Sequence, residues 1–419
     1  MISKHKLYSI ALVSGAIILM LTSITCAFQY AYIANSGNNT VSVIDADNDN
    51  VTATINANEL NYPNGVAVTS DGKEAYITNS NSNKVSIIAT ANNTVYANVN
   101  VGFSPYGVAV TPNGSTVYVC NVISKNVSII NTTNKTAYAS IPIGKYPYGV
   151  VVAPDGTKIY VTNVVDNSVS IINTTNNTVY ASVPVGKYPY GVVVAPDGVN
   201  LYVANEGSNN VSVINTTNNT AYASVTVGRY PYGIAVTPDG KNVYVANEGS
   251  NNVSVINTTN NNVYASVTVG KNPYGVAATP DGTKVYVTNI VSNDVSIINT
   301  SNNTAYDSLP VGKVPFSLGQ FIGNIPVDPT LPVAQFTANL TTGNAPLTVK
   351  FTDTSTGSPA PWFWFWSFGD GTYSTQENPV HTYSTTRDYN VVMVAVSNAG
   401  SSKSNVTTIN VTAATPTIT

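Results

Sequence analysis

The side chains that most often perform catalysis or bind metals are scarce in this sequence. Its 419 residues include two histidines, His5 and His381, and both lie outside the long repetitive segment from residue 28 to 323. A histidine-ligated haem, a histidine-based metal site and a Ser-His-Asp triad all need histidine beside their other groups. The glycines are spread singly at turns and form no phosphate-binding cluster. The sequence therefore predicts no cofactor and no catalytic or metal-binding histidine in this segment.

Carboxylates are the groups that could still do chemistry. Glu206 and Glu248 occupy the same loop position in successive repeats, so we expect them to face each other across neighbouring loops. Such a pair could bind Ca²⁺ or support a lactonase-like activity, although we favour a simple loop contact without catalysis or a resident metal. An Asp-Gly pair also recurs, and because it suits a β-turn we interpret it as structural. Its aspartates are Asp71, Asp155, Asp197, Asp239 and Asp281.

The charge balance excludes one large class of function. The chain has 17 basic and 20 acidic side chains, a formal net charge of -3 and 9% charged residues. A nucleic-acid-binding protein needs a basic surface to neutralise phosphates, so we expect no nucleic-acid partner. With 43% hydrophobic residues and 27 tyrosines, the composition is typical of folded β structure.

The N-terminus has the features of an export signal. Lys4 and Lys6 precede an apolar run from residue 7 to 21, and Thr25-Cys26-Ala27 offers a small-residue cleavage site. Residues 1–27 are therefore predicted to be a signal peptide, with an uncleaved signal anchor and a lipid anchor on Cys26 as alternatives. We expect no membrane span beyond this signal. Cleavage would leave Cys120 without a disulfide partner in the chain.

Self-similarity is the dominant feature of the rest of the sequence. Seven prolines follow one another at intervals of 42 residues, and a Tyr-aliphatic-x-Asn segment recurs seven times beside them. Within one unit, residues 231–272, short alternating apolar segments between Gly- and Asn-rich turns predict four antiparallel strands. Four such strands form one blade of a β-propeller. The prolines are Pro63, Pro105, Pro147, Pro189, Pro231, Pro273 and Pro315.

The phase of the repeat predicts how the array ends. The first unit begins at Gln29 with a second-strand sequence, whereas residues 315–321 form a first-strand sequence with nothing after it. We therefore expect the C-terminal strand to complete the N-terminal blade. This would close a seven-bladed ring over residues 28–323 and remove the open sheet edge of a linear array.

These segments resemble the YVTN family of β-propeller repeats, whose tetrapeptide appears here at residues 160–163 and 286–289. It recurs at fixed spacing from a Pro-Tyr-Gly-Val strand. The resemblance implies a seven-bladed ring of the kind found in secreted and surface proteins, including surface-layer and cell-surface proteins of methanogenic archaea. It does not imply one activity.

A second domain is predicted at residues 333–412, after a proline-rich linker at 324–332 and before a Thr-rich tail at 413–419. Its Trp-x-Phe-Gly-Asp-Gly and Pro-x-His-x-Tyr elements resemble a PKD domain, which implies an immunoglobulin-like β-sandwich and a structural role for His381. Alternation places Trp364, Trp366 and Phe368 on the core face. Phe363 and Phe365 fall on the other face, where they could pack on the ring or linker, or contact a glycan or protein.

Asn-x-Ser/Thr sequons are dense in the sequence, and many fall at predicted hairpin tips. The same residues also make good turns. In an exported chain with few charges, glycans at the tips would supply solvation, so we predict a glycosylated rim. The candidate sites are Asn173, Asn176, Asn215, Asn218, Asn257, Asn299 and Asn302.

Together these features predict an all-β, exported and non-enzymatic protein of the cell surface or envelope. It would act as a structural or adhesive module through multivalent contacts, with other envelope proteins or surface glycans as partners. The alternative is a secreted propeller hydrolase or lyase that uses carboxylates, with or without Ca²⁺. A carrier of a small ligand in the central channel is a third reading.

Overall fold

The computed structural model describes residues 11–13, 16–18, 27–326, 330–358, 361–397 and 400–413. The chain divides into two compact units, and the larger is formed by Ala27–Pro326. Of the predicted signal peptide, only β1 (Ala11–Val13), β2 (Ala16–Ile18) and residue 27 are described. The predicted anchors, the cleavage site around Cys26 and nearly all of the tail lie outside the described residues. No helix within the described parts is long and apolar enough to cross a membrane.

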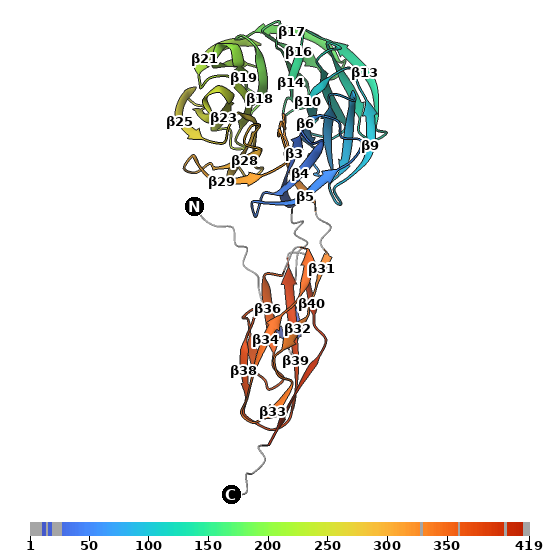
Figure 1. Ribbon diagram of the computed structural model, residues 1–419, viewed down its shortest axis with the longest axis vertical. Helices are drawn as coiled ribbons and strands as arrows, with labels where there is room; N and C mark the ends of the chain where they lie inside the picture. Colours follow the sequence, from blue (N-terminus) through green and yellow to red (C-terminus); the bar gives the residue numbers. More distant parts are fainter. Residues whose placement is uncertain are drawn as a thin grey trace. The chain divides into compact units, whose positions relative to one another are not determined.

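The larger unit is a β-propeller. Seven four-stranded antiparallel sheets follow one another along the chain, and Figure 1 shows them arranged around a common centre. We number blades 1 to 6 from the sheet that begins at Pro63, and call the sheet of β30, β3, β4 and β5 the closing blade. The predicted all-β fold with seven blades is confirmed.

The strands of each blade have equivalent bounds. The first strands are β6 (Pro63–Val68), β10 (Pro105–Val110), β14 (Pro147–Val152), β18 (Pro189–Val194), β22 (Pro231–Val236), β26 (Pro273–Ala278) and β30 (Ile322–Pro326). The second strands are β3 (Ala27–Asn35), β7 (Glu74–Asn79), β11 (Thr116–Asn121), β15 (Lys158–Asn163), β19 (Asn200–Asn205), β23 (Asn242–Asn247) and β27 (Lys284–Asn289). The third strands are β4 (Thr40–Asp45), β8 (Lys84–Ala89), β12 (Asn126–Asn131), β16 (Ser168–Asn173), β20 (Asn210–Asn215), β24 (Asn252–Asn257) and β28 (Asp294–Asn299). The fourth strands are β5 (Asn50–Asn56), β9 (Thr94–Asn100), β13 (Thr136–Pro142), β17 (Thr178–Pro184), β21 (Thr220–Thr226), β25 (Asn262–Thr268) and β29 (Thr304–Pro310).

The burial of the strands explains why their sequences differ. In blade 5, the second and third strands, β23 and β24, are buried along most of their length, whereas the fourth strand, β25, is largely exposed. A middle strand is covered on both faces by neighbouring blades, so most of its side chains on both faces are apolar. The turn between β22 and β23 uses Gly240 at a φ of 71°, a conformation that glycine adopts without strain.

The closing blade confirms that a C-terminal strand completes the N-terminal blade, but this strand lies later in the sequence than predicted. Pro315 pairs with Asn35, as the first-strand prolines pair in other blades. The regular ladder, however, lies at β30 rather than at residues 315–321, with Ile322 opposite Ala31. Seven positions separate Pro315 from Ile322, whereas five separate the equivalent Pro63 and Val68. Two inserted residues therefore displace the strand, and it runs into the predicted linker.

Hydrogen bonds between blades explain part of the Tyr-Val-Thr-Asn pattern. Thr162 Oγ1 accepts from the backbone N–H of Gly149 at 2.8 Å and donates to the carbonyl of Tyr190, in the next blade, at 2.9 Å. The Thr162 side chain is fully buried, and leaving its hydroxyl unpaired would cost about 1–3 kcal/mol. The threonine thus links the first strands of adjacent blades.

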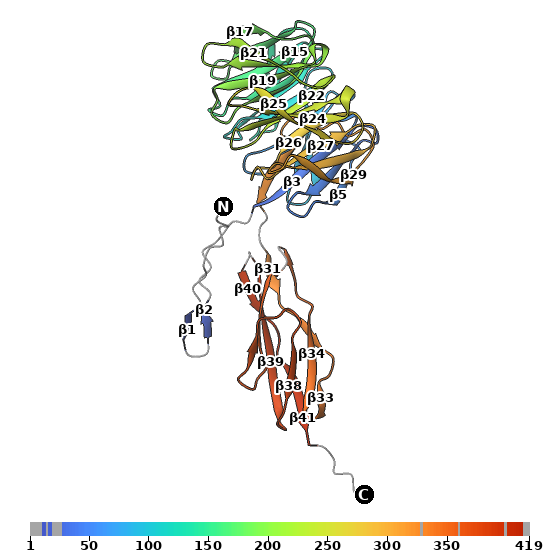
Figure 2. The ribbon, with the colours of Figure 1, turned by 90° about the vertical axis from the view of Figure 1, so that its left-hand side faces the viewer.

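The second unit contains a β-sandwich, and Figure 2 labels several of its strands, such as β34, β38 and β39. One sheet has the order β32-β34-β38 and the other β33-β41-β39-β36-β37, with β40 paired to β39 and β31 to β35. Trp366 and Phe368 are buried in its core as predicted, while Trp364 is only partly buried against it. The strands are β31 (Thr330–Val333), β32 (Phe336–Ala338), β33 (Thr342–Asn344), β34 (Leu347–Asp353), β35 (Thr356–Ser358), β36 (Phe363–Ser367), β37 (Tyr373–Ser374), β38 (Val380–Tyr383), β39 (Asp388–Ser397), β40 (Gly400–Lys403) and β41 (Thr407–Thr412).

Candidate functional site

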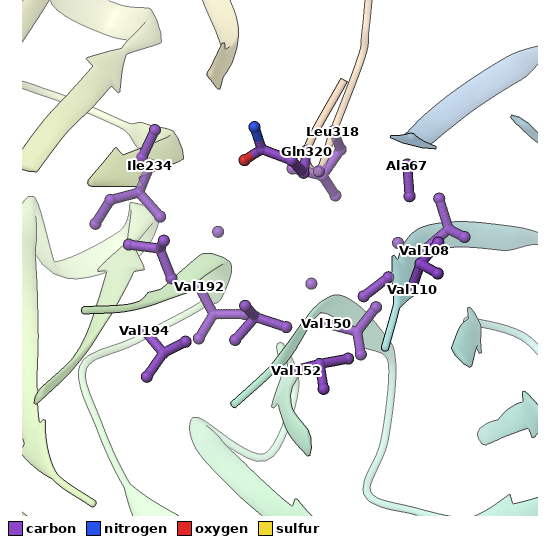
Figure 3. A pocket seen from close by; sticks show the side chains of 18 of the residues that line it. Ala67, Val108, Val110, Val150, Val152, Val192, Val194, Ile234, Leu318 and Gln320 are labelled. Carbon is purple, nitrogen blue, oxygen red and sulfur yellow. The ribbon is translucent and has the colours of Figure 1, made fainter. Parts of the chain in front are cut away.

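The first strands of the blades surround a cavity of about 360 Å³ at the centre of the ring (Figure 3). Its wall is almost entirely aliphatic, and the amide of Gln320, from the inserted segment, points into it. The residues that line the cavity include no carboxylate, histidine, cysteine or lysine. It offers an apolar surface rather than acid–base groups. The labelled lining residues are Ala67, Val108, Val110, Val150, Val152, Val192, Val194, Ile234, Leu318 and Gln320.

A ring of aromatic side chains comes directly before this cavity along the first strands. Neighbouring ring centroids lie 4.5–4.9 Å apart, and the hydroxyls of Tyr148 and Tyr274 hydrogen-bond to each other. Both tyrosines are buried, and burial raises their pKa well above the usual value. They therefore stay protonated and act as packing and hydrogen-bonding groups. The ring consists of Tyr106, Tyr148, Tyr190, Tyr232, Tyr274 and Phe316.

The propeller has two faces, which differ in the segments that form them. The loop face contains the segments before each first strand, such as Lys187–Tyr188, and after each second strand, such as Glu206–Ser208. The turn face contains the turns between first and second strands, such as 237–240, and the hairpin tips between third and fourth strands, such as 258–261. Thr258 Oγ1 donates to the carbonyl of Gly240 at 2.7 Å, which joins tip and turn on this face.

The two glutamates lie on the loop face. Glu206 begins η1 (Glu206–Ser208) and Glu248 begins η2 (Glu248–Ser250), in neighbouring blades. Burial raises the pKa of Glu206, and the negative charge of Glu248 raises it further, so the two carboxylates interact electrostatically. Glu248 Oε1 also accepts a hydrogen bond from Asn272 Nδ2 at 2.9 Å. Within the described residues, no three carboxylate, histidine or cysteine side chains gather as metal ligands.

The recurring aspartates sit in the turns where the sequence places them. Asp239 Oδ1 accepts from Thr237 Oγ1 at 2.6 Å and from the backbone N–H of Lys241 at 3.1 Å. The hydrogen bond from Thr237 is the main cause that lowers the pKa of Asp239. The carboxylate thus stabilises its own turn.

The asparagine that ends each second strand also acts within its own blade. Asn205 Nδ2 donates to Asn210 Oδ1 at 2.8 Å and to Ser212 Oγ at 2.9 Å, while Asn205 Oδ1 is buried without a partner. The same pattern recurs in most blades. These amides therefore line no exposed ring for a ligand.

The predicted glycosylation sites all lie at hairpin tips on the turn face. They occupy the tips of blades 3 to 6, with one or two at each of these tips, and the two positions within a tip differ in exposure. Asn176, Asn218 and Asn302 are exposed, whereas Asn173, Asn215, Asn257 and Asn299 are partly buried. At the exposed positions the asparagine Oδ1 accepts from the hydroxyl of the following sequon threonine, as Asn218 does from Thr220 at 2.7 Å.

The sandwich holds the other predicted residues. Phe363 and Phe365 are partly buried, and Phe365 stacks on Tyr373 with centroids 5.3 Å apart. His381 stacks on Phe368 at 4.2 Å and contacts the Asp370 carboxylate at 2.7 Å. The histidine is therefore held between a core ring and a turn carboxylate, consistent with a structural role.

Two features of the ring escaped the sequence analysis. The aromatic residue after six of the seven repeat prolines, a tyrosine in five cases and Phe316 in the sixth, forms the aromatic ring. The tyrosine before some of those prolines, such as Tyr188, is exposed on the loop face. Both recur at intervals of 42 residues, so the repeat itself contained the signal. Strand alternation did not reveal it, because the side-chain direction at a strand entry depends on the loop before it.

The comparisons with known proteins agree with this architecture. The propeller matches the virginiamycin B lyase family model over residues 49–318, and residues 327–413 match the PKD domain. A protein of unknown function from Desulfotomaculum acetoxidans DSM 771 is 18% identical with a TM-score of 0.62, over 72% of this chain and 99% of its own. A candidate 6-phosphogluconolactonase from Bacteroides uniformis ATCC 8492 is 17% identical with a TM-score of 0.60, over 70% and 98%.

No curated protein matches the chain. At such low identities the likeness to the solved structures shows the fold alone. The family match, in contrast, spans more than half of the sequence. The chain therefore belongs to the virginiamycin B lyase family of β-propellers, here joined to a C-terminal PKD domain.

Proposed function

We propose that the protein is an exported, non-enzymatic module of the cell envelope that binds other envelope proteins or surface glycans through the loop face of its ring. A propeller followed by a PKD domain is typical of extracellular binding or structural proteins. The signal-like N-terminus supports export, and the repeat resemblance supports an archaeal surface-layer or cell-surface setting. The PKD domain would serve as a spacer or second contact site.

The observation that carries this proposal is the apolar character of the loop face. Its loops expose large hydrophobic side chains, which the stability of the fold does not require in this position. Phe103 and Ile123, for example, are 62% and 67% exposed. The backbone N–H of Ile123 bonds to the carbonyl of Phe103, so these two lie together. Exposed apolar groups that cluster mark interaction sites. The others on this face are Tyr146, Val165, Tyr188, Tyr230 and Val291.

The first and last strands of the ring meet at one edge. Ala27 pairs with Pro326, so the chain enters and leaves the ring at one edge. That edge belongs to the turn face, because Asn324 packs against the turn at Gly72. The predicted glycan sites also lie on the turn face. The predicted glycans would therefore occupy one face of the ring and the proposed binding surface the other.

The alternative function is a hydrolase or lyase that uses carboxylates, and the family name, virginiamycin B lyase, points in that direction. Glu206 and Glu248 are the groups that would serve it. The lining of the central channel offers no carboxylate or histidine, and the ring sequence from residue 28 to 323 contains no histidine to work beside them. We therefore favour binding over catalysis.

The test is retention of the purified chain, from Phe28 to Thr419, on isolated cell envelopes of its source organism. We expect saturable retention that falls when Phe103 and Ile123 are both replaced by serine. A charge variant on the turn face, Lys241→Gln, is the matched control and should bind normally. Absence of retention, together with turnover of a lactone that is lost in Glu206→Gln/Glu248→Gln, would replace this proposal with the enzymatic one.

A further inference from the structure

Blades 4 and 5 present the same exposed group of side chains on the loop face, which we call the cassette. In blade 4 it consists of Lys187 and Tyr188 before the first strand and Glu206–Ser208 after the second strand. In blade 5 it consists of Arg229, Tyr230 and Glu248–Ser250. Each cassette therefore joins a cation, a phenol ring and a carboxylate.

The backbone holds the two cassettes in matching geometry. Ser208 Oγ accepts from the N–H of Lys187 at 2.7 Å, and the N–H groups of Glu206 and Gly207 donate to the carbonyls of Tyr188 and Lys187 at 2.9 and 3.0 Å. The equivalent distances in blade 5 are 2.8, 2.9 and 3.0 Å. The cassettes are thus preorganised duplicates on adjacent blades.

Glycine allows each tyrosine ring to lie close against the backbone. A Cβ atom on Gly207 would lie 2.6 Å from Tyr188 Cδ2, and one on Gly249 would lie 2.5 Å from Tyr230 Cδ2. The rings nonetheless remain 50% and 45% exposed. Each phenol is therefore supported by the turn beneath it and still offers surface to a ligand.

These tyrosines occupy a backbone conformation that suits them poorly. Tyr188 and Tyr230 have φ values of 53° and 55°, in the left-handed region that bulky residues avoid. Asn272 holds the equivalent position in blade 6 at 54°, and asparagine tolerates this region much better. Stability alone would favour asparagine in all three blades. The strain is not confined to these two blades, since Tyr62 and Tyr146 hold the equivalent positions at 56° and 63°. Only in blades 4 and 5, however, does a glutamate follow the second strand beside such a tyrosine, and strained, exposed rings paired with a carboxylate point to a function.

The charged side chains of the two cassettes indicate which class of ligand could bind there. Among the described residues, neither Lys187 nor Arg229 takes part in an ion pair, and the Arg229 guanidinium lies 5.8 Å from the Tyr230 ring centroid. A cation beside an aromatic face suits a flat ligand with an anionic substituent. The carboxylates of Glu206 and Glu248 would accept hydrogen bonds from hydroxyl groups.

We propose that the two cassettes form a binding site for an acidic glycan, with one sugar ring stacked on Tyr188 and another on Tyr230. The C–H groups of each sugar would pack on the phenol face, whose quadrupole is negative. Lys187 and Arg229 would pair with carboxylate or sulfate substituents, and the two glutamates with sugar hydroxyls. This inference rests on the proposed function and names the ligand class for the same face.

The test compares binding of alginate, dextran sulfate and neutral dextran to the chain from Phe28 to Thr419 at physiological salt. The informative variant is Tyr188→Asn/Tyr230→Asn, because blade 6 shows that asparagine fits this position. We expect binding of alginate or dextran sulfate that weakens about tenfold or more in this variant. Its unfolding temperature should stay the same or rise, which a merely structural role for the rings would not produce. Lys271→Gln is the control and should bind normally, because in blade 6 Asn272 and Ile290 stand where the cassettes have tyrosine and glutamate.

The outcomes separate this inference from the proposed function. No binding of the three polysaccharides, equal binding of neutral dextran, or normal binding by the asparagine variant would overturn the acidic-glycan site. If envelopes still retain that variant as well as they retain the wild type, the loop face binds another partner and the broader proposal stands. If envelopes retain neither protein, both proposals are wrong.

Discussion

Replacing Gly191 by alanine should destabilise the ring strongly, because this glycine lies where two first strands come into close contact. A Cβ atom there would lie 2.1 Å from the backbone carbonyl oxygen of Tyr232, in the next blade. An ordinary contact needs at least about 3 Å, so β18 and β22 would have to separate by roughly 1 Å. That movement would also part Tyr190 from Tyr232, whose centroids are 4.5 Å apart. Overpacking against backbone of this kind costs about 3 kcal/mol.

Gly198, in the turn of the same blade, provides the matched control. Its φ is 74°, so alanine would be strained, but the nearest atom to its Cβ is 3.8 Å away. The left-handed conformation alone costs about 1 kcal/mol. Urea or thermal unfolding, followed by circular dichroism, should therefore rank wild type above Gly198→Ala and Gly198→Ala above Gly191→Ala. For a domain of this size, about 2 kcal/mol between the variants corresponds to roughly 3 °C. Equal midpoints for the two variants would refute the close-approach argument.

Three further perturbations test other parts of the molecule. Lys284 forms an ion pair with Asp49 at 2.8 Å across the junction of blade 6 and the closing blade, and the two side chains are 20% and 16% exposed. Lys284→Met should therefore lower the unfolding free energy by about 2 kcal/mol. An unchanged unfolding free energy in a denaturant titration would show that this pair does not stabilise ring closure. In the sandwich, burial raises the pKa of Asp370, but hydrogen bonds and the contact with His381 outweigh burial and lower this pKa below 3.8. The resulting stabilisation is present above the unfolded pKa and is lost as the pH falls through the folded pKa, so the sandwich should lose stability below about pH 4. Asp370→Asn should weaken this pH dependence when unfolding is followed by near-UV circular dichroism. Burial raises the pKa of the Cys120 thiol, so Ellman's reagent should modify it only after unfolding, and rapid reaction of the native protein would contradict its buried placement.

Much of the architecture could be predicted because the repeat places the same local constraints in every blade. The four antiparallel strands predicted for residues 231–272 are present as β22 to β25. Alternating apolar residues, Asp-Gly turns and asparagine-rich tips each specify local structure, and these determinants agree along the whole unit. The sequence also indicated ring closure, since the array began with a second strand and ended with a first.

The placement of the closing strand could not be predicted in the same way. Residues 315–321 look like a first strand, but the two-residue insertion moves the ladder to β30. The register of the last strand depends on Ala31 and its neighbours, which lie almost 300 positions earlier in the chain. No local pattern contains that information.

The sequence by itself determined the fold class, the number of blades and the residues at each turn, because these depend on periodicity and local backbone preference. Only the tertiary structure decided what the loops form together. The repeat predicted that Glu206 and Glu248 occupy equivalent positions, but ring closure decided that they share a face with the strained tyrosines Tyr188 and Tyr230. That face is a property of neighbouring blades packed side by side, and residues 42 positions apart become one surface only when the ring is closed.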